Sequence, residues 1–139
     1  MFVDLHTHSQ YSPDSNCAIY DMALSQKEKG TSVFAVTDHF DYPNRCDEES
    51  VKEIINSVSD ARNTKVEGVE ILAGVEISRG NSCPETVKHL IDVCDFDVII
   101  GSVHGVELNG VFLRPSITDF SVFNKEETEI IIDNYFDYL

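Results

Sequence analysis

Six side chains of the types that bind divalent metals lie at or near the ends of apolar, strand-like runs of this sequence. They are four imidazoles and two carboxylates: His6, His8, Asp14, His39, Glu76 and His104. In parallel α/β folds the carboxyl ends of the strands meet on one face, so residues that are distant in sequence converge there. The pattern predicts a site for several metal ions, of the kind that hydrolases use.

Four of these residues also have a simpler interpretation. His6 and His8 point to the same side of a strand and could share an ion, but an His-x-His pair is also common on surfaces. Glu76 is costly to bury unless it is paired or metal-bound, and otherwise would face solvent at its strand end. His104 alone could be a satisfied core residue. Four successive strand ends that all carry ligand types favour the metal site.

Two further residues near these motifs need separate interpretations. Asp38, beside His39, could orient a ligand imidazole by accepting a hydrogen bond from it, or it could cap the following helix. His89 lies next to Lys88 in the middle of a predicted helix, which is typical of a solvated face rather than a ligand.

The elements that would position the site alternate between strand and helix. Strands are expected at residues 2–5, 33–37, 69–77 and 97–103, with helices at 19–29, 48–63, from a capping box at 82–85 to about 93, and from 125 almost to 139. A small hairpin is expected around Asn109-Gly110. Four such βα units imply a parallel sheet with right-handed crossovers.

The chain length bounds this architecture. A closed barrel of eight βα units needs about 250 residues, so these 139 residues supply roughly half a barrel in a single domain, 1–139, that looks truncated at its C-terminus. An open half exposes strand edges and must be covered. We expect either a partner, most simply a second copy that forms a homodimer, or a longer protein of which this chain is a piece.

Composition excludes several classes of function. The formal charge is −15 and the ten lysines and arginines do not cluster, so no nucleic-acid partner is expected. No apolar run is long enough for a membrane helix, and the N-terminus lacks a secretory signal, which predicts a cytoplasmic protein. The four cysteines form no Cys-x-x-Cys pair and are expected to be reduced.

The motifs together resemble a known family. Asp-Leu-His-Thr-His-Ser (4–9), Ser-Pro-Asp-Ser (12–15), Thr-Asp-His-Phe-Asp (37–41), Gly-Val-Glu-Ile (74–77) and Ile-Gly-Ser-Val-His (100–104) look like the polymerase and histidinol phosphatase (PHP) superfamily. The second, third and last of these motifs look most like its histidinol-phosphatase branch. The resemblance extends to about residue 113.

The resemblance implies a distorted seven-stranded TIM-like (β/α) barrel with up to three zinc, manganese or iron ions. By motif, His6, His8 and Glu76 would hold one ion, Glu76 would bridge to a second ion that His104 also holds, and Asp14 and His39 would hold a third. The catalytic set would be His6, His8, Glu76 and His104. Family members carry a further histidine and an Asp-x-His pair later in the barrel, whereas no histidine follows His104 here. Each ion would therefore lose one protein ligand, and the ion at His6, His8 and Glu76 should bind most tightly.

The implied activity is hydrolysis of a small phosphate monoester by water that the metal activates, as in the histidinol phosphatase of histidine biosynthesis. Arg45, Arg79 and Arg114 are candidates to bind the substrate phosphate, although each could equally be a surface arginine. Two alternatives stay open. One is another phosphoesterase of the superfamily, including a nuclease, and the other is a catalytically incomplete fragment that binds metal.

Overall fold

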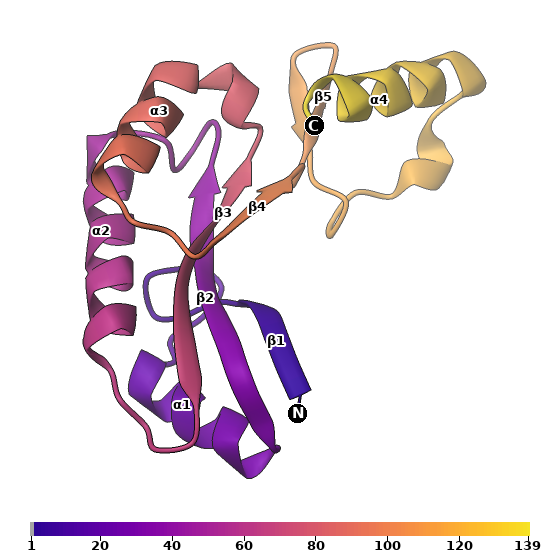
Figure 1. Cartoon of the computed structure of the whole chain (residues 1–139). Helices are drawn as coiled ribbons and strands as arrows, with labels where there is room; N and C mark the ends of the chain where they lie inside the picture. The colour runs from indigo at the N-terminus through magenta and orange to yellow at the C-terminus, as the bar shows by residue number, and fades with distance from the viewer. Residues whose placement is uncertain (1) are drawn as a thin grey trace.

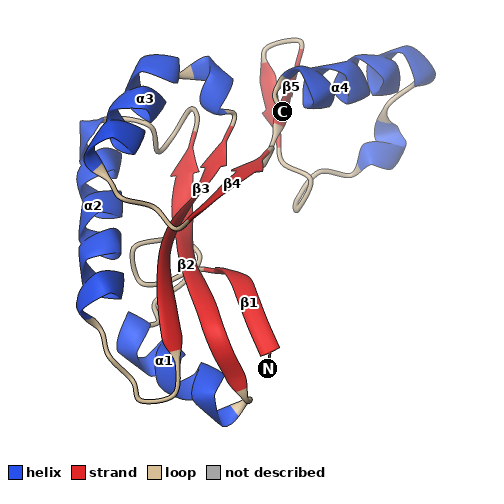
Figure 2. Ribbon diagram, in the orientation of Figure 1, coloured by secondary structure: helices blue, strands red, loops and turns tan. Residues whose placement is uncertain are grey.

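A curled, four-stranded parallel sheet forms the centre of the protein, which is described here by a computed structural model covering residues 2–139. The strands are β1 (Phe2–Thr7), β2 (Thr31–Asp41), β3 (Glu70–Ser78) and β4 (Val98–Ser102), in the spatial order β1-β2-β3-β4. Helices α1 (Ile19–Glu28), α2 (Glu48–Asn63) and α3 (Pro84–Val93) cover one face of the sheet, and the other face is open (Figures 1 and 2). The predicted half-barrel is confirmed.

A smaller unit follows the sheet. Strands β5 (Val106–Leu108) and β6 (Val111–Leu113) form the expected hairpin, with Asn109 and Gly110 both at positive φ in its turn. Helix α4 (Lys125–Asp137) then packs on this hairpin, beyond the end of β4 (Figure 1). Its own small core contains Val103, Val106, Leu108 and Ile131.

Local signals explain where most helices begin and end. The Asp47 carboxylate accepts a hydrogen bond from the Ser50 N–H at the start of α2, and Asn124 and Glu127 form a reciprocal capping box at the start of α4. The capping box expected at 82–85 is absent, because Gly80–Ser82 form a short 3-10 turn (η1) and Cys83, whose side chain makes no capping bond, occupies the cap position.

Strand β2 separates the helix-covered face from the open face. Side chains alternate along a strand, so Phe40 and Asp38 point toward the helices while His39 and Asp41 point the other way. Phe40 packs with Ile54 of α2 in the central core, and Asp38 reaches the same helix. The strand is longer than residues 33–37, and it therefore carries His39 within the sheet rather than after it.

The edges and the concave face of the sheet leave apolar side chains in solvent. Phe2 is 70% exposed, and Val3, Leu5 and Ile99 are each about half exposed on the two edge strands. Helix α4 likewise presents Phe136 to solvent. None of the helices within residues 2–139 combines the length and the apolarity that a membrane crossing requires.

Candidate metal centre

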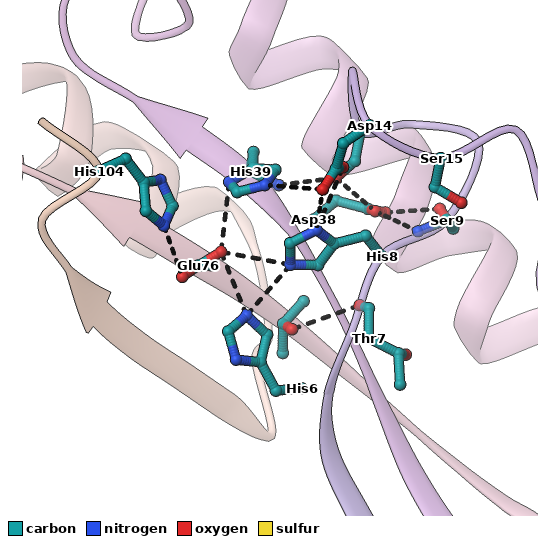
Figure 3. Close-up of polar contacts among 12 residues, drawn as sticks. His6, Thr7, His8, Ser9, Asp14, Ser15, Asp38, His39, Glu76 and His104 are labelled. Atoms are coloured by element: carbon teal, nitrogen blue, oxygen red, sulfur yellow. Dashed lines mark hydrogen bonds and ion pairs between the residues drawn. The ribbon is translucent and has the colours of Figure 1, made fainter. Parts of the chain in front are cut away.

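The six predicted side chains meet at the carboxyl ends of the strands (Figure 3). His6 lies in β1 and His8 directly after it, while Asp14 comes from the loop that leads to α1. His39 and Glu76 are paired across β2 and β3, which sets their side chains next to each other in the sheet. His104 follows two residues after β4. The sequence therefore predicted the convergence of these groups.

Glu76 is the centre of the cluster. Its side chain is only 2–3% exposed, and one oxygen, Oε2, lies 3.2 Å from His6 Nε2, 3.3 Å from His8 Nε2 and 3.2 Å from His39 Nδ1. The other oxygen, Oε1, lies 2.9 Å from His104 Nε2. The solvent-facing interpretation of Glu76 is wrong, because its strand is interior to the sheet and four imidazoles surround the carboxylate.

The spacing of these atoms fits a cation. Ligands held about 2.0–2.1 Å from a tetrahedral ion lie roughly 3.3 Å from one another. The Nε2 atoms of His6 and His8 are 3.1 Å apart, and both are within 3.3 Å of Glu76 Oε2. Glu76 Oε2 and His39 Nδ1 are also buried without a well-aligned hydrogen bond among the described residues. Buried polar atoms without a hydrogen bond indicate that a further group, such as an ion, belongs beside them.

Three overlapping groups could each hold an ion: His6, His8 and Glu76; His8, Asp14 and His39; and His39, Glu76 and His104. The first matches the predicted grouping. The other two differ from it because His39 lies between the carboxylates of Asp14 and Glu76, with Nε2 3.5 Å from Asp14 Oδ2 and Nδ1 3.2 Å from Glu76 Oε2. Each group thus offers three protein ligands.

Ring nitrogens limit how many groups can be filled together. His8 faces Glu76 with Nε2 and faces Asp14 with Nδ1, at 3.0 Å. A neutral imidazole has a lone pair on only one nitrogen, so His8 serves one of its two groups at a time, and the same holds for His39. Glu76 can bridge, because each oxygen of a carboxylate can bind a separate ion. The compatible pair is the first group together with His39, Glu76 and His104.

Asp41 belongs to the centre and was missed by the sequence interpretation. Its carboxylate lies 3.3 Å from His39 Nδ1 and 3.2 Å from His104 Nδ1. For His104 this contact is on the nitrogen opposite to Glu76, which is how a carboxylate fixes the tautomer of a ligand histidine. The signal was present, because residue 41 lies two positions after His39 and so on the same side of β2.

Asp38 has a different role from both of those expected. Its buried carboxylate accepts hydrogen bonds from the Ser9 N–H at 2.6 Å, from the Ser9 and Ser12 hydroxyls at 2.6 and 2.9 Å, and from the Ser57 hydroxyl at 2.5 Å. It therefore neither orients an imidazole nor caps a helix. It ties the loop that carries Asp14 to α2, because it points to the helix-covered side of the sheet.

The three candidate arginines are in different states. Arg45 is engaged by Glu53 and by the Tyr11 carbonyl oxygen, each 2.8 Å from Nη2. Arg79 is buried among aromatic rings. Arg114 is exposed, and among residues 2–139 its guanidinium meets only the Phe112 ring, whose centroid is 5.9 Å away. Arg114 is thus the guanidinium most free to meet a ligand.

A pocket of about 580 Å³ opens beside the centre. Asp14, His39, Asp41 and His104 contribute to one part of its lining, and the rest comes mainly from the loop after β2 and from β6 and the turn that follows it. Tyr42, Phe112 and Arg114 are among those other lining residues. His89 is exposed on α3 and takes no part in the cluster, as predicted.

The charges of the centre shift its titration. The hydrogen bond to Glu76 raises the pKa of His8 to about 9, and hydrogen bonds to Asp41 and Glu76 raise the pKa of His104 to about 10. Burial alone would raise the pKa of Glu76, but His104 and His8 outweigh it and hold this pKa far below its usual range. Burial is likewise outweighed at Asp14 and Asp41, whose pKa values the histidines lower. Without metal, His8 and His104 are therefore cationic at neutral pH.

Fold and cluster together define the class of protein: an open parallel α/β half-barrel with clustered imidazoles and carboxylates at its strand ends. Residues 4–138 match the PHP domain family. The chain belongs to this family.

Individual relatives agree with the family match. The chain is 28% identical over 136 residues to a probable histidinol-phosphatase of Clostridium acetobutylicum, covering 98% of this chain and 50% of the relative. It is 31% identical to a probable phosphatase of Tolumonas auensis, covering 73% of this chain and 40% of the relative. It is also 35% identical, over 73% of its length, to 18% of the DNA polymerase/3′-5′ exonuclease PolX of Bacillus subtilis. The chain thus spans half or less of the length of each of these relatives.

A solved structure has the same fold. The histidinol phosphate phosphatase of Lactococcus lactis, crystallised with zinc, L-histidinol and phosphate, superposes with a TM-score of 0.54 over 80% of this chain and 42% of its own. At 24% identity this likeness bears on the fold alone.

Proposed function

We propose that this chain supplies the metal-binding half of a phosphoesterase that hydrolyses a small phosphate monoester, of the histidinol-phosphatase type. The observation that carries the proposal is the buried carboxylate of Glu76, which meets four imidazoles within 3.3 Å at the carboxyl edge of the sheet. Two buried atoms of this arrangement, Glu76 Oε2 and His39 Nδ1, lack a hydrogen-bond partner among the described residues, and a cation would supply one to both.

The residues would divide the work as follows. His6, His8 and Glu76 would hold one ion, while His39, Glu76 and His104 would hold a second, with Asp41 fixing the tautomer of His104. Divalent ions at such a site supply Lewis acidity, which offsets phosphate charge and makes water nucleophilic near neutral pH. Asp14 lies 3.0 Å from His8 Nδ1 and would orient that ring by accepting a hydrogen bond from its N–H.

Two ions is the number that the described ligands support. A third ion, at His8, Asp14 and His39, would require the second nitrogens of two rings that the other ions already occupy. Zinc is supported by the nitrogen-rich ligand set and by its presence in the Lactococcus lactis structure. Manganese and iron remain candidates, because imidazole–carboxylate sites also suit them.

The surrounding pocket supports a small substrate. Its volume of about 580 Å³ is within the usual range for small-molecule sites. Arg114 would bind the anionic substrate, while Arg45 and Arg79 are occupied by other contacts. A role in histidine biosynthesis and a cytoplasmic location are further parts of this proposal, and they follow from the histidinol-phosphatase likeness.

A nuclease is the second candidate, because the chain also matches part of the PolX protein. The charge of −15 opposes binding to a polyanion, so we favour the monoester. A catalytically incomplete fragment is the third candidate, because the chain spans only half of the first of these relatives.

Hydrolysis of three substrates after loading with zinc or manganese separates these functions. L-histidinol phosphate and 4-nitrophenyl phosphate are monoesters, whereas bis(4-nitrophenyl) phosphate is a diester. We expect metal-dependent release of phosphate from a monoester that is lost in Glu76→Gln and retained in His89→Gln. Hydrolysis of the diester alone would favour the nuclease, and stoichiometric metal binding without turnover would identify the incomplete fragment.

The open face raises the question of a partner. Apolar side chains at the edges and on the open side of the sheet, such as Phe2 and Ile99, would be covered in a homodimer or by a further barrel half. The homodimer stays a prediction, and sedimentation or light scattering of the purified chain measures it directly.

A further inference from the structure

Arg79 has two energetically unfavourable features, one in its backbone and one in its side chain, that the metal centre does not explain. It follows β3 directly, and its backbone has the left-handed φ of 55° that residues other than glycine avoid. Its side chain is also only 3% exposed, and a buried guanidinium is unfavourable unless its surroundings compensate. Retaining both features at one position indicates a role for the side chain.

Three aromatic rings enclose the guanidinium. Its central carbon lies 3.7 Å from the centroid of the Tyr138 ring and 5.3 Å from the centroids of the Tyr42 and Phe112 rings. Cations are attracted to the faces of such rings, and more strongly where water is excluded. Glu107 lies 3.5 Å from Nη2, while Nε and Nη1 have no hydrogen-bond partner within residues 2–139. The rings and Glu107 are therefore what compensates the buried charge.

The rings come from three separate parts of the chain. Tyr42 lies just after β2, Phe112 lies in β6, and Tyr138 caps the end of α4. Arg79 therefore connects the main sheet to the hairpin and to the last helix. The Asn81 side chain adds a second link to the same helix end, since its amide donates to the Asp137 carbonyl oxygen at 2.8 Å.

The same junction holds His104. The Arg79 N–H donates to the Ser102 carbonyl oxygen at 3.2 Å, and the neighbouring Ser78 hydroxyl accepts from the His104 N–H at 2.9 Å. Phe112 packs so closely on Gly105 that a Cβ there would lie 2.5 Å from the ring. The segment that carries His104 is thus fixed on one side by the end of β3 and on the other by a ring that Arg79 contacts.

We propose that Arg79 is a positioning residue that holds the His104 imidazole against Glu76 by clamping the hairpin and the end of α4 onto β3. The proposal rests on the proposed function only in taking His104 as a metal ligand. Arg79 would touch neither the metal nor the substrate. It would act through the segment of residues 102–105 and through the Phe112 side of the pocket.

The test is a zinc titration of the full chain with histidine rings labelled with ¹⁵N and followed by NMR. In Arg79→Met we expect the His104 ring signals to shift and broaden, and the zinc affinity of the His39, Glu76 and His104 group to fall at least tenfold. Zinc binding by His6 and His8 should keep wild-type affinity. Arg79→Lys, which restores a cation among the rings, should recover most of the loss. Arg62→Met removes an arginine from the Asp97 ion pair far from the centre and should behave as wild type.

Several results would overturn the proposal. A folded Arg79→Met variant with wild-type His104 signals and zinc affinity would exclude a positioning role. Equal weakening at all the ligand histidines would assign Arg79 to general stability instead. Should Arg79→Met fail to fold, Tyr138→Leu provides the test, because it removes the ring nearest to the guanidinium. This variant is expected to shift the His104 signals and to leave those of the other ligand histidines unchanged. Unchanged His104 signals in Tyr138→Leu would exclude the positioning role of Arg79. Absence of zinc binding in the wild type would sink the proposed function, while the metal-free His104 signals would still test Arg79.

Discussion

Without metal, the stability of this protein should fall as the pH rises from 6.5 to 9. The metal-free centre contains imidazoles whose folded pKa values are raised, to about 9 for His8 by its hydrogen bond to Glu76 and to about 10 for His104 by Asp41 and Glu76. A group of this kind stabilises the fold fully below its unfolded pKa of about 6.5, and the contribution is lost as the pH rises through the folded pKa. The metal-free protein should therefore weaken between pH 6.5 and 9.

The magnitude follows from His8, whose side chain is 17% exposed. Raising its pKa from 6.5 to about 9 corresponds to about 3 kcal/mol of stability at low pH. His104 acts in the same direction, but its side chain is 35% exposed and solvent screening reduces its share. The carboxylates, whose pKa values are lowered, are ionised throughout this window and add no slope. For a chain of 139 residues, 3 kcal/mol corresponds to roughly 10 °C in the melting temperature.

Bound metal should remove this slope. Zinc needs neutral imidazoles, so His8 and His104 must release protons, and the affinity of each ion should rise about tenfold per pH unit for each proton displaced. Ligand binding stabilises the fold in proportion to the logarithm of the ratio of ligand concentration to dissociation constant. Stability with zinc should therefore rise relative to the metal-free protein from pH 6.5 to 9.

Thermal unfolding followed by circular dichroism, in EDTA and in zinc at several pH values, measures both slopes. In EDTA, His8→Asn should reduce the fall of the melting temperature with pH by the part that His8 contributes. The matched control His89→Gln, at an exposed histidine on α3, should leave this fall unchanged. A metal-free protein whose stability is level or increases from pH 6.5 to 9 would refute the reasoning. So would a zinc effect that shrinks over the same range.

Three substitutions test other parts of the centre. Glu76→Gln removes the carboxylate shared by two of the three ligand groups, so isothermal titration should find at least a hundredfold weaker zinc binding, and wild-type affinity would contradict the assignment. Asp38→Ala leaves buried serine donors without an acceptor, so urea unfolding should show a loss of about 3 kcal/mol in the free energy of unfolding. Ser57→Ala removes only one of these donors and should cost about 1 kcal/mol. Equal losses in the two variants would argue against Asp38 as the residue that ties the Asp14 loop to α2. Arg114→Ala should raise KM for a phosphate monoester about tenfold with little change in kcat, while Arg62→Ala should change neither constant; a selective loss of kcat would place Arg114 in the chemical step instead.

The features that could be predicted from sequence are mostly set by neighbouring residues. Asp47 caps α2 through Ser50, three positions away, and the Asn109-Gly110 turn needs only two residues that tolerate positive φ. Apolar runs likewise locate buried strands. Where a local signal failed, another local structure replaced it, as at Cys83, where the preceding 3-10 turn shifted the start of α3 beyond the predicted cap.

The partners of each side chain could not be predicted in the same way, because they depend on contacts between distant elements. Asp38 and Asp41 are both aspartates close to His39, and composition does not distinguish them. Alternation along β2 sends Asp38 toward α2, where Ser57 meets it, and sends Asp41 toward His104, which is 63 positions away. Only the packing of α2 and the path of the chain after β4 decide these contacts.

The allocation of ligands to ions shows this limit most clearly. The family resemblance implies that Asp14 and His39 share an ion, while the register of the sheet also pairs His39 with Glu76 and turns its Nδ1 toward that carboxylate. Once Nδ1 is committed there, Nε2 must carry the proton and can only donate it, and Asp14 is the acceptor in reach. The same reasoning applies to His8, so with ions bound at the other two groups Asp14 would orient these two rings, as proposed above. A zinc stoichiometry of two would support this allocation, whereas a stoichiometry of three would show that His8, Asp14 and His39 also hold an ion.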